Sequence, residues 1–194
     1  TQYGGAFKVD TLAHRRQVHK RSSLPYIVDP LHVSVILLRH GFSTETAIAG
    51  LLHDLVEDQG YELSRIAEQF GPRVAEMVEA LTEQKRDARG EKRPWDVRKR
   101  EALEQVRDAG RETVAVKAAD TLHNAHSFTH DLRREGHRIW RHFNRGPQSQ
   151  LDYYRKILQI TEETLSDHPL AAELAEAIDR LSQAVDETAP HDKG

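Results

Sequence analysis

Residues 49–58 read A-G-L-L-H-D-L-V-E-D, a run that joins apolar residues to one imidazole and three carboxylates. At helical spacing His53 and Glu57 share one face, and Asp54 and Asp58 share the next. Carboxylates this close repel one another unless a cation or a basic partner neutralises them. A divalent metal ion neutralises them and also activates water for hydrolysis. The run therefore predicts a helical scaffold that carries a hydrolytic metal site.

Composition narrows the class of protein. The 194 residues fit one domain with a real core, and the net charge of -3 gives no general basic field for nucleic acid. The absence of cysteine excludes disulfides and thiolate metal sites, so a metal would be held by His and carboxylates, which suits Mn²⁺, Mg²⁺, Fe²⁺ or Zn²⁺. No stretch has the apolar length of a membrane span or the layout of a signal peptide. We therefore expect a cytoplasmic protein that binds neither nucleic acid nor membrane.

Apolar residues recur at helical spacing, and neither sustained alternation nor a hairpin signal indicates strands. Asp29 is expected to cap a helix that begins at Pro30, and Ser43 or Thr44 to cap the helix that carries residues 49–58. The sequence predicts about nine helices in one all-α domain over residues 1–194. Its core covers about residues 6–166, followed by a C-terminal helix at about 169–185 and a frayed tail.

A second polar cluster lies in residues 116–124, V-K-A-A-D-T-L-H-N. On a helix Lys117, Asp120 and Asn124 fall on one face, at spacings of three and four residues. For a helix taken alone, a solvated stripe with a Lys-Asp pair explains this face. Beside residues 53–58, Asp120 instead supplies the further carboxylate that a metal site needs.

A third cluster lies in residues 20–26, K-R-S-S-L-P-Y. Two cations and two hydroxyls ahead of Pro25 can bind a phosphate group or the edge of a base. A surface loop shaped by Pro25 is the alternative explanation, and it is the better one for this cluster taken alone.

Four strings together resemble the HD-domain phosphohydrolases, and within them the hydrolase domain of the RelA/SpoT alarmone enzymes. They are R-S-S-L-P-Y-I-V-D-P, A-G-L-L-H-D-L-V-E-D, F-G-P-R-V-A-E-M-V and V-K-A-A-D-T-L-H-N-A. Their order and spacing match over about residues 14–130, and the stand-alone small alarmone hydrolases are the most similar form. The resemblance implies an HD-domain helical bundle.

The resemblance also implies the roles of the acidic clusters. His53, Asp54 and Asp120 match metal ligands of the family, and the metal implied is a divalent ion, Mn²⁺ above all. Glu57 and Asp58 match the acidic pair that orients and deprotonates the attacking water. Crowding among like charges raises the pKa of a carboxylate, which suits such a base.

The substrate implied by the resemblance is a guanosine nucleotide. Lys20, Arg21 and Ser22 match the loop that holds the guanine base, and Lys117 and Asn124 match residues near the sugar and phosphates. The implied reaction removes the 3′-pyrophosphate from ppGpp or pppGpp and yields GDP or GTP plus pyrophosphate. Nothing in the residues indicates the oligomeric state.

The sequence departs from the family at Asp29, where the family has a His that is the first metal ligand. Asp29 can ligate through oxygen, which still suits Mn²⁺ or Mg²⁺. His32, one helical turn later, can replace the missing ligand. As a third interpretation, Asp29 is only an N-cap and the metal site is weakened or lost.

Two alternatives to alarmone hydrolysis follow. A related phosphohydrolase can act on another nucleotide such as NADPH, because fold and metal site do not fix the substrate. A degenerate HD domain can bind a nucleotide or a protein without turnover. The basic residues Arg93, Arg98, Lys99 and Arg100 either hold phosphate charge or form a solvated face.

Overall fold

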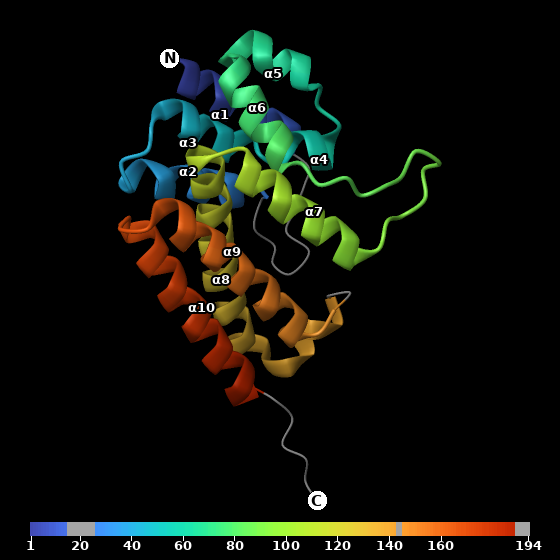
Figure 1. Ribbon diagram of the computed structural model, residues 1–194, viewed down its shortest axis with the longest axis vertical. Helices are drawn as coiled ribbons and strands as arrows, with labels where there is room; N and C mark the ends of the chain where they lie inside the picture. The colour runs from blue at the N-terminus through green and yellow to red at the C-terminus, as the bar shows by residue number, and fades with distance from the viewer. Residues whose placement is uncertain (15–25, 143–144, 189–194) are drawn as a thin grey trace, which may run out of the picture.

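A computed structural model describes residues 1–14, 26–142 and 145–188. These residues form ten α-helices and one 3₁₀ helix, which confirms the all-α expectation (Figure 1). Among them no strand forms, and a single antiparallel bridge pairs Arg86 with Lys92 in the connection between α6 and α7. No helix in these ranges is long and apolar enough to cross a lipid bilayer.

The helices follow one another with short connections. Their bounds are α1 (Gln2–His14), α2 (Val28–Arg39), α3 (Thr44–Leu52), α4 (Leu55–Gln59), α5 (Leu63–Phe70), α6 (Pro72–Leu81), α7 (Trp95–Asp108), α8 (Arg111–Glu135), η1 (Gly136–His142), α9 (Pro147–Leu165) and α10 (Pro169–Thr188).

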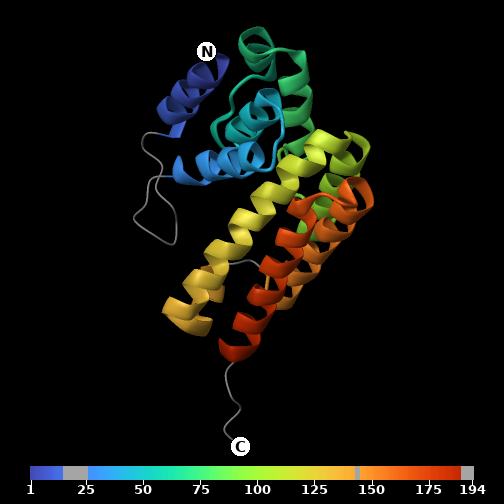
Figure 2. The same cartoon turned by 90° about the vertical axis from the view of Figure 1, so that its left-hand side faces the viewer.

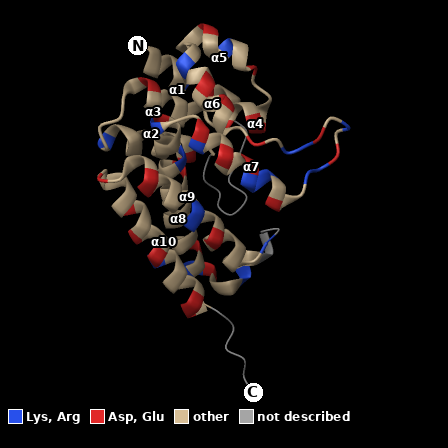
Figure 3. Ribbon diagram, in the orientation of Figure 1, with Lys and Arg blue, Asp and Glu red and all other residues tan. Residues whose placement is uncertain are grey.

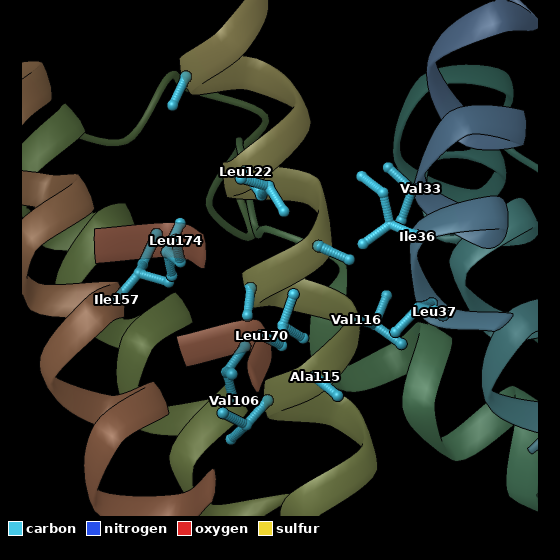
Figure 4. Packing of buried hydrophobic residues seen from close by; sticks show 14 of the residues in the cluster. Val33, Ile36, Leu37, Val106, Ala115, Val116, Leu122, Ile157, Leu170 and Leu174 are labelled. Carbon is cyan, nitrogen blue, oxygen red and sulfur yellow. The ribbon is translucent and has the colours of Figure 1, made fainter. Parts of the chain in front are cut away.

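Helix α8 is the axis of the molecule. Figure 2 shows it running from the group of shorter N-terminal helices into a bundle with α9 and α10. Figure 4 shows the two sides of its packing: Val33 and Leu37 of α2 face Val116 on one side, and Leu170 of α10 lies on the other. One buried cluster joins side chains from α1 to α10. The one-domain organisation over residues 1–194 stays a prediction.

Gly50 lets helices α2 and α3 pack closely. A Cβ atom at this position would lie 2.6 Å from Leu37 Cδ1 and 3.3 Å from Val33 Cγ1, well inside van der Waals contact. Gly50 therefore lets the Leu37 and Val33 side chains of α2 pack against the backbone of α3, and a side chain at this position would require Leu37 to move. This contact sets the position of the end of α3, where His53 begins.

Several helix ends match the sequence patterns. Ser43 caps α3, and its hydroxyl accepts a hydrogen bond from the Thr46 backbone nitrogen at 3.2 Å. Helix α5 ends before Gly71, where φ is 98°, and α6 follows at once with a proline in its first turn. The expectation for Asp29 is wrong: α2 is capped by Ile27, so Asp29 lies inside the first turn and makes no side-chain cap.

Candidate active site

The sequence around His53 interrupts the helix that was expected to run through residues 49–58. Helix α3 ends at Leu52, and α4 starts again at Leu55. His53 Nδ1 lies 2.7 Å from the Gly50 carbonyl oxygen, the acceptor that the backbone of residue 54 would use in a continuous helix. Because a carbonyl only accepts, Nδ1 carries the proton and donates it, and Nε2 faces the opposite way.

Two carboxylates meet this Nε2 atom. It lies 3.2 Å from Asp54 Oδ1 and 3.7 Å from Asp120 Oδ1, while the His53 side chain is 7% exposed. Asp54 caps the start of α4, whereas Asp120 comes from the middle of α8. The fold thus brings together three residues predicted to be metal ligands, from segments 66 positions apart.

Lys117 and Asn124 hold Asp120 from the same face of α8. Lys117 Nζ donates to Asp120 Oδ2 at 2.9 Å, and Asn124 Nδ2 donates to Oδ1 at 2.7 Å. The predicted common face of these three residues is therefore confirmed. Both residues were expected to touch substrate, and in the structure their polar atoms orient a carboxylate.

Tyr26 joins the two acidic pairs, a contact that the sequence did not predict. Its hydroxyl donates to Asp54 Oδ2 at 2.5 Å and lies 3.3 Å from Asp58 Oδ2. Burial and then the Asp54 carboxylate raise the pKa of Tyr26, so the hydroxyl keeps its proton and stays a donor. Tyr26 belongs to the string R-S-S-L-P-Y-I-V-D-P. Its place in that string was the one signal in the sequence that could have assigned it to the site.

Lys85 joins Glu57 and Asp58, and it too was missed. Its Nζ lies 2.8 Å from Glu57 Oε1 and 3.0 Å from Asp58 Oδ1, and the Glu83 backbone nitrogen donates to Glu57 Oε2 at 3.0 Å. Burial opposes the charge on Lys85, but Glu57 and Asp58 outweigh it and raise the pKa of the lysine. In the sequence Lys85 is one of eight basic residues between positions 85 and 100, with no feature to separate it from the others.

The electrostatics of the buried group favour opposite charges on His53 and Asp120. Burial opposes protonation of His53, but Asp54 and Asp120 together raise its pKa to about 10. Burial likewise opposes ionisation of Asp120, yet Lys117 and His53 hold the pKa of that carboxyl well below its usual range. Burial raises the pKa of Asp54. A positive charge is thus strongly favoured between the two carboxylates.

These residues fit a divalent cation by their donor chemistry. Two ligand atoms that each lie about 2.1 Å from one ion at a right angle are about 3 Å apart. The separations of His53 Nε2 from Asp54 and Asp120 are close to that value. In the described ranges, however, no three His, Asp or Glu side chains already surround a point as a compact metal cluster. The side chains of the group would therefore have to rearrange to surround an ion.

Asp29 faces a different partner. Its Oδ1 lies 3.1 Å from Nε2 of His123, which is buried on α8. His123 Nδ1 in turn lies 2.7 Å from His32 Nδ1, so one of these two nitrogens donates and the other accepts. The two residues proposed for the missing family ligand, Asp29 and His32, are therefore connected through His123.

A pocket of about 100 Å³ opens beside these residues. Its walls include His53, Asp54, Glu57 and Lys117, together with Tyr153 of α9, which the sequence did not assign to the site. Tyr153 lies under Lys99 Nζ, 4.9 Å from the ring centroid. The predicted base-binding residues lie outside the described residues: Lys20, Arg21 and Ser22.

The basic residues at and just before the start of α7 are only partly free for phosphate. Glu83 pairs with Arg98 and lies 2.6 Å from Lys99 Nζ, and Arg93 Nη2 lies 2.6 Å from Glu101 Oε1. Arg98 and Lys99 share the one carboxylate of Glu83, so these ion pairs only partly neutralise the basic residues, and they do not decide between phosphate binding and a solvated face.

A buried acid and imidazole lie behind Tyr26. Asp10 and His14 of α1 are both essentially inaccessible, with His14 Nε2 3.2 Å from Asp10 Oδ1. The His14 ring lies 4.8 Å from the Tyr26 ring. The structure buries His14 where it packs against the tyrosine that contacts Asp54.

Curated relatives have names of two kinds, a guanosine-polyphosphate hydrolase and a GTP pyrophosphokinase. A guanosine-3′,5′-bis(diphosphate) 3′-pyrophosphohydrolase of Xenopus tropicalis is 36% identical over 124 residues, 62% of this chain and 64% of that protein. A probable GTP pyrophosphokinase of Mycobacterium leprae (strain TN) is 37% identical over 119 residues, 61% of this chain. The chain spans only 15% of the length of that pyrophosphokinase.

Solved structures agree on the fold. A protein of Listeria monocytogenes EGD-e matches with a TM-score of 0.69 and 34% identity, over 82% of this chain and 99% of that one. A metazoan ortholog of SpoT that hydrolyzes ppGpp matches with a TM-score of 0.72 over 95% of this chain and 97% of that one. At 21% identity, the second likeness concerns the fold alone. The family model of the HD domain matches residues 6–151, and the chain therefore belongs to the HD-domain family, as its four strings predict.

Proposed function

We propose that this chain is a divalent-metal-dependent phosphohydrolase that removes the 3′-pyrophosphate from ppGpp or pppGpp. One observation carries the proposal: His53 and Asp54, at the junction of α3 and α4, converge with Asp120 of α8, and the pocket beside them also reaches Glu57. The names of the relatives at 34–37% identity support the choice of a guanosine polyphosphate.

His53, Asp54 and Asp120 are proposed to hold the cation, which we take to be Mn²⁺, with Asp29 or His32 as a further ligand. Such an ion supplies a Lewis acid that lowers the pKa of a coordinated water and polarises a phosphoryl oxygen. The His53 Nδ1 hydrogen bond to Gly50 fixes the tautomer whose Nε2 can ligate. Lys117 and Asn124 keep Asp120 turned toward the same point.

Glu57 and Asp58 are proposed to orient the attacking water and accept its proton. The water oxygen forms a bond to the 3′-phosphorus, the bond from that phosphorus to the ribose 3′-oxygen breaks, and the proton passes to the departing oxygen. The products are GDP or GTP and pyrophosphate. Lys85 is the counter-ion of both carboxylates in the free protein, with its Nζ 2.8 Å from Glu57 Oε1 and 3.0 Å from Asp58 Oδ1.

We propose that Lys20, Arg21 and Ser22 hold the guanine base, with Lys117 and Asn124 near the sugar and phosphates. The family resemblance and the position of Lys117 in the pocket wall support this assignment. An HD phosphohydrolase acting on another nucleotide, such as NADPH, would use the same metal site and differ at the base-binding loop.

A non-catalytic nucleotide-binding domain is the second candidate. The contact of Asp29 with His123 favours it, because a carboxylate engaged by an imidazole is less available to a metal ion. This candidate differs from the first in one measurable property, which is turnover of a nucleotide with added cation.

The test is a panel of nucleotides with added Mn²⁺, comparing ppGpp, pppGpp, NADPH and GTP. We expect pyrophosphate release from the first two, and the same assay without metal gives the control. Absence of bound metal after incubation with Mn²⁺, together with no pyrophosphate release from ppGpp, would exclude the hydrolase function. Release from NADPH alone would favour the other nucleotide.

A further inference from the structure

A small basic pocket lies beside the candidate active site, in the connection between α6 and α7. Its volume is about 210 Å³, several times the space of about 30 Å³ that one water molecule takes in the liquid. Figure 3 shows Lys and Arg along this connection and at the start of α7. Five side chains line the pocket, and every one is basic: Lys85, Arg86, Lys92, Arg93 and Arg98.

Backbone pairing builds this pocket. Arg86 and Lys92 form the antiparallel bridge, and on either side of it the Arg93 nitrogen donates to the Lys85 carbonyl at 3.1 Å and the Asp87 nitrogen to the Glu91 carbonyl at 3.0 Å. A short ladder of this kind fixes the spacing of the side chains that it carries. The basic side chains are thus held around one space by the main chain.

The cations of the pocket are not equally neutralised. Arg93 and Arg98 pair with Glu101 and Glu83. Arg86 Nη1 instead donates to the Gly90 carbonyl, and among the described residues Lys92 makes no ion pair. Two full positive charges in the pocket wall therefore lack a carboxylate partner in the described part of the chain, which favours an anionic ligand.

Lys85 connects the pocket to the catalytic carboxylates. It lines the pocket, and its Nζ also lies 2.8 Å from Glu57 and 3.0 Å from Asp58. An anion in the pocket would therefore lie within the reach of one lysine side chain from the residues proposed to activate water. A diphosphate attacked beside these carboxylates could therefore extend its second phosphate toward the pocket along Lys85.

We propose that this five-cation pocket binds the distal phosphate of the 3′-pyrophosphate group and so selects a 3′-diphosphate over a 3′-monophosphate. The inference rests on the proposed function and adds to it the site that holds the pyrophosphate group, which is transferred to water. As the distal phosphate enters, Lys85 turns from Glu57 and Asp58 toward the phosphate. The carboxylates lose a counter-ion at the moment when a base is needed.

The test compares the double variant Arg86→Gln/Lys92→Gln with Arg89→Gln. Arg89 lies on the same exposed connection but does not line the pocket, so it controls for loss of charge. The substrates are guanosine 5′-diphosphate with either a 3′-diphosphate or a 3′-monophosphate. We expect the double variant to lose at least about tenfold in kcat/KM on the 3′-diphosphate and less than about twofold on the 3′-monophosphate. Arg89→Gln should change neither by more than about twofold.

An equal loss on both substrates, or the same loss in Arg89→Gln, would overturn the inference. If the wild type turns over neither substrate, the proposed function fails. Binding of inorganic pyrophosphate then tests separately whether the pocket binds phosphate. Calorimetry without divalent cation should then show at least about fivefold weaker binding in the double variant than in Arg89→Gln. Equal binding by the two variants would also overturn the proposal that this pocket binds phosphate.

Discussion

Two groups of possible metal ligands meet the same turn of α8, and they differ in what surrounds them. Asp120 lies with His53 and Asp54, and each of its oxygens also accepts a hydrogen bond from α8 itself. His123, three residues later, lies with Asp29 and His32. The first group faces a pocket beside the proposed base, whereas the second forms a row of contacts across α2 and α8.

The two groups differ because of one residue, Asp29. Where the family has a His, this chain has a carboxylate, and a carboxylate attracts the nearest imidazole. His123 is in place for that contact because it follows Asp120 by one helical turn. The first group has the residue types that the resemblance assigns to metal ligands, while in the second group Asp29 contacts His123.

Removing Asp120 should have the largest effect, because it belongs to the intact group. Asp120→Ala should lower kcat by more than about 100-fold, the upper end for residues that merely support a ligand. It also leaves Lys117 buried without its partner, which should lower the free energy of unfolding by up to about 3 kcal/mol. Turnover of ppGpp with Mn²⁺ and a denaturant melt measure the two effects.

The double variant Asp120→Ala/Lys117→Met separates these effects. It removes the unpaired charge, so stability should return while activity stays lost. Activity in a variant that lacks Asp120 would show that the metal site has been placed wrongly.

Tyr26→Phe should have the next largest effect, since it deletes only the hydroxyl that joins Asp54 and Asp58. We expect kcat to fall about 10- to 100-fold, the range for partners that orient a ligand, with little change in KM. The matched control is Tyr61→Phe, whose hydroxyl accepts from Gln69 at an exposed position. Equal losses in both variants would mean that Tyr26 acts through packing alone.

Most of the fold follows from the sequence. Helical periodicity predicts the all-α class, and local chemistry predicts the cap at Ser43 and the break at Gly71. The interruption at His53 was not predictable, because it depends on a side chain taking a backbone acceptor. The prediction for Asp29 was wrong because it rested on residue type alone. Asp suits an N-cap, but α2 begins at Val28, two residues before Pro30.

The sequence predicted the acidic residues of the site but not the residues that pair with them. The strings that contain His53, Asp54 and Asp120 are recognisable, so residue type and order were enough to select these three as candidate ligands. Tyr26 and Lys85 reach the carboxylates from 28 and 27 positions away, through tertiary contacts that no local spacing encodes. The roles assigned to all of these residues stay predictions until variants are measured.

Asp29→His tests whether the second group can be returned to the family pattern. An imidazole has no negative charge to hold against His123, so its nitrogen is available to the cation. We expect cation affinity to rise about tenfold, with a parallel gain in turnover at limiting cation. Asp29→Asn is the control, because it removes the charge without adding a nitrogen ligand. Equal cation affinity in the two variants would indicate that Asp29 lies outside the metal site.

The smallest effect concerns a proton within the intact group. In the metal-free protein the raised pKa of His53, about 10, means that the imidazole is charged at pH 7. A cation needs the neutral ring, so binding must release that proton, and affinity should rise by up to about tenfold per pH unit below 10. The same raised pKa means that the charged ring stabilises the metal-free fold at pH values below the unfolded pKa of about 6.5, a contribution lost as the pH rises through 10.

Calorimetry in two buffers of different ionisation enthalpy counts the protons released when the cation binds, and we expect about one released per Mn²⁺ at pH 7.5. A count of zero in the wild type would mean that His53 is already neutral, and the attraction between the two carboxylates and a positive charge would then be weaker than their geometry indicates.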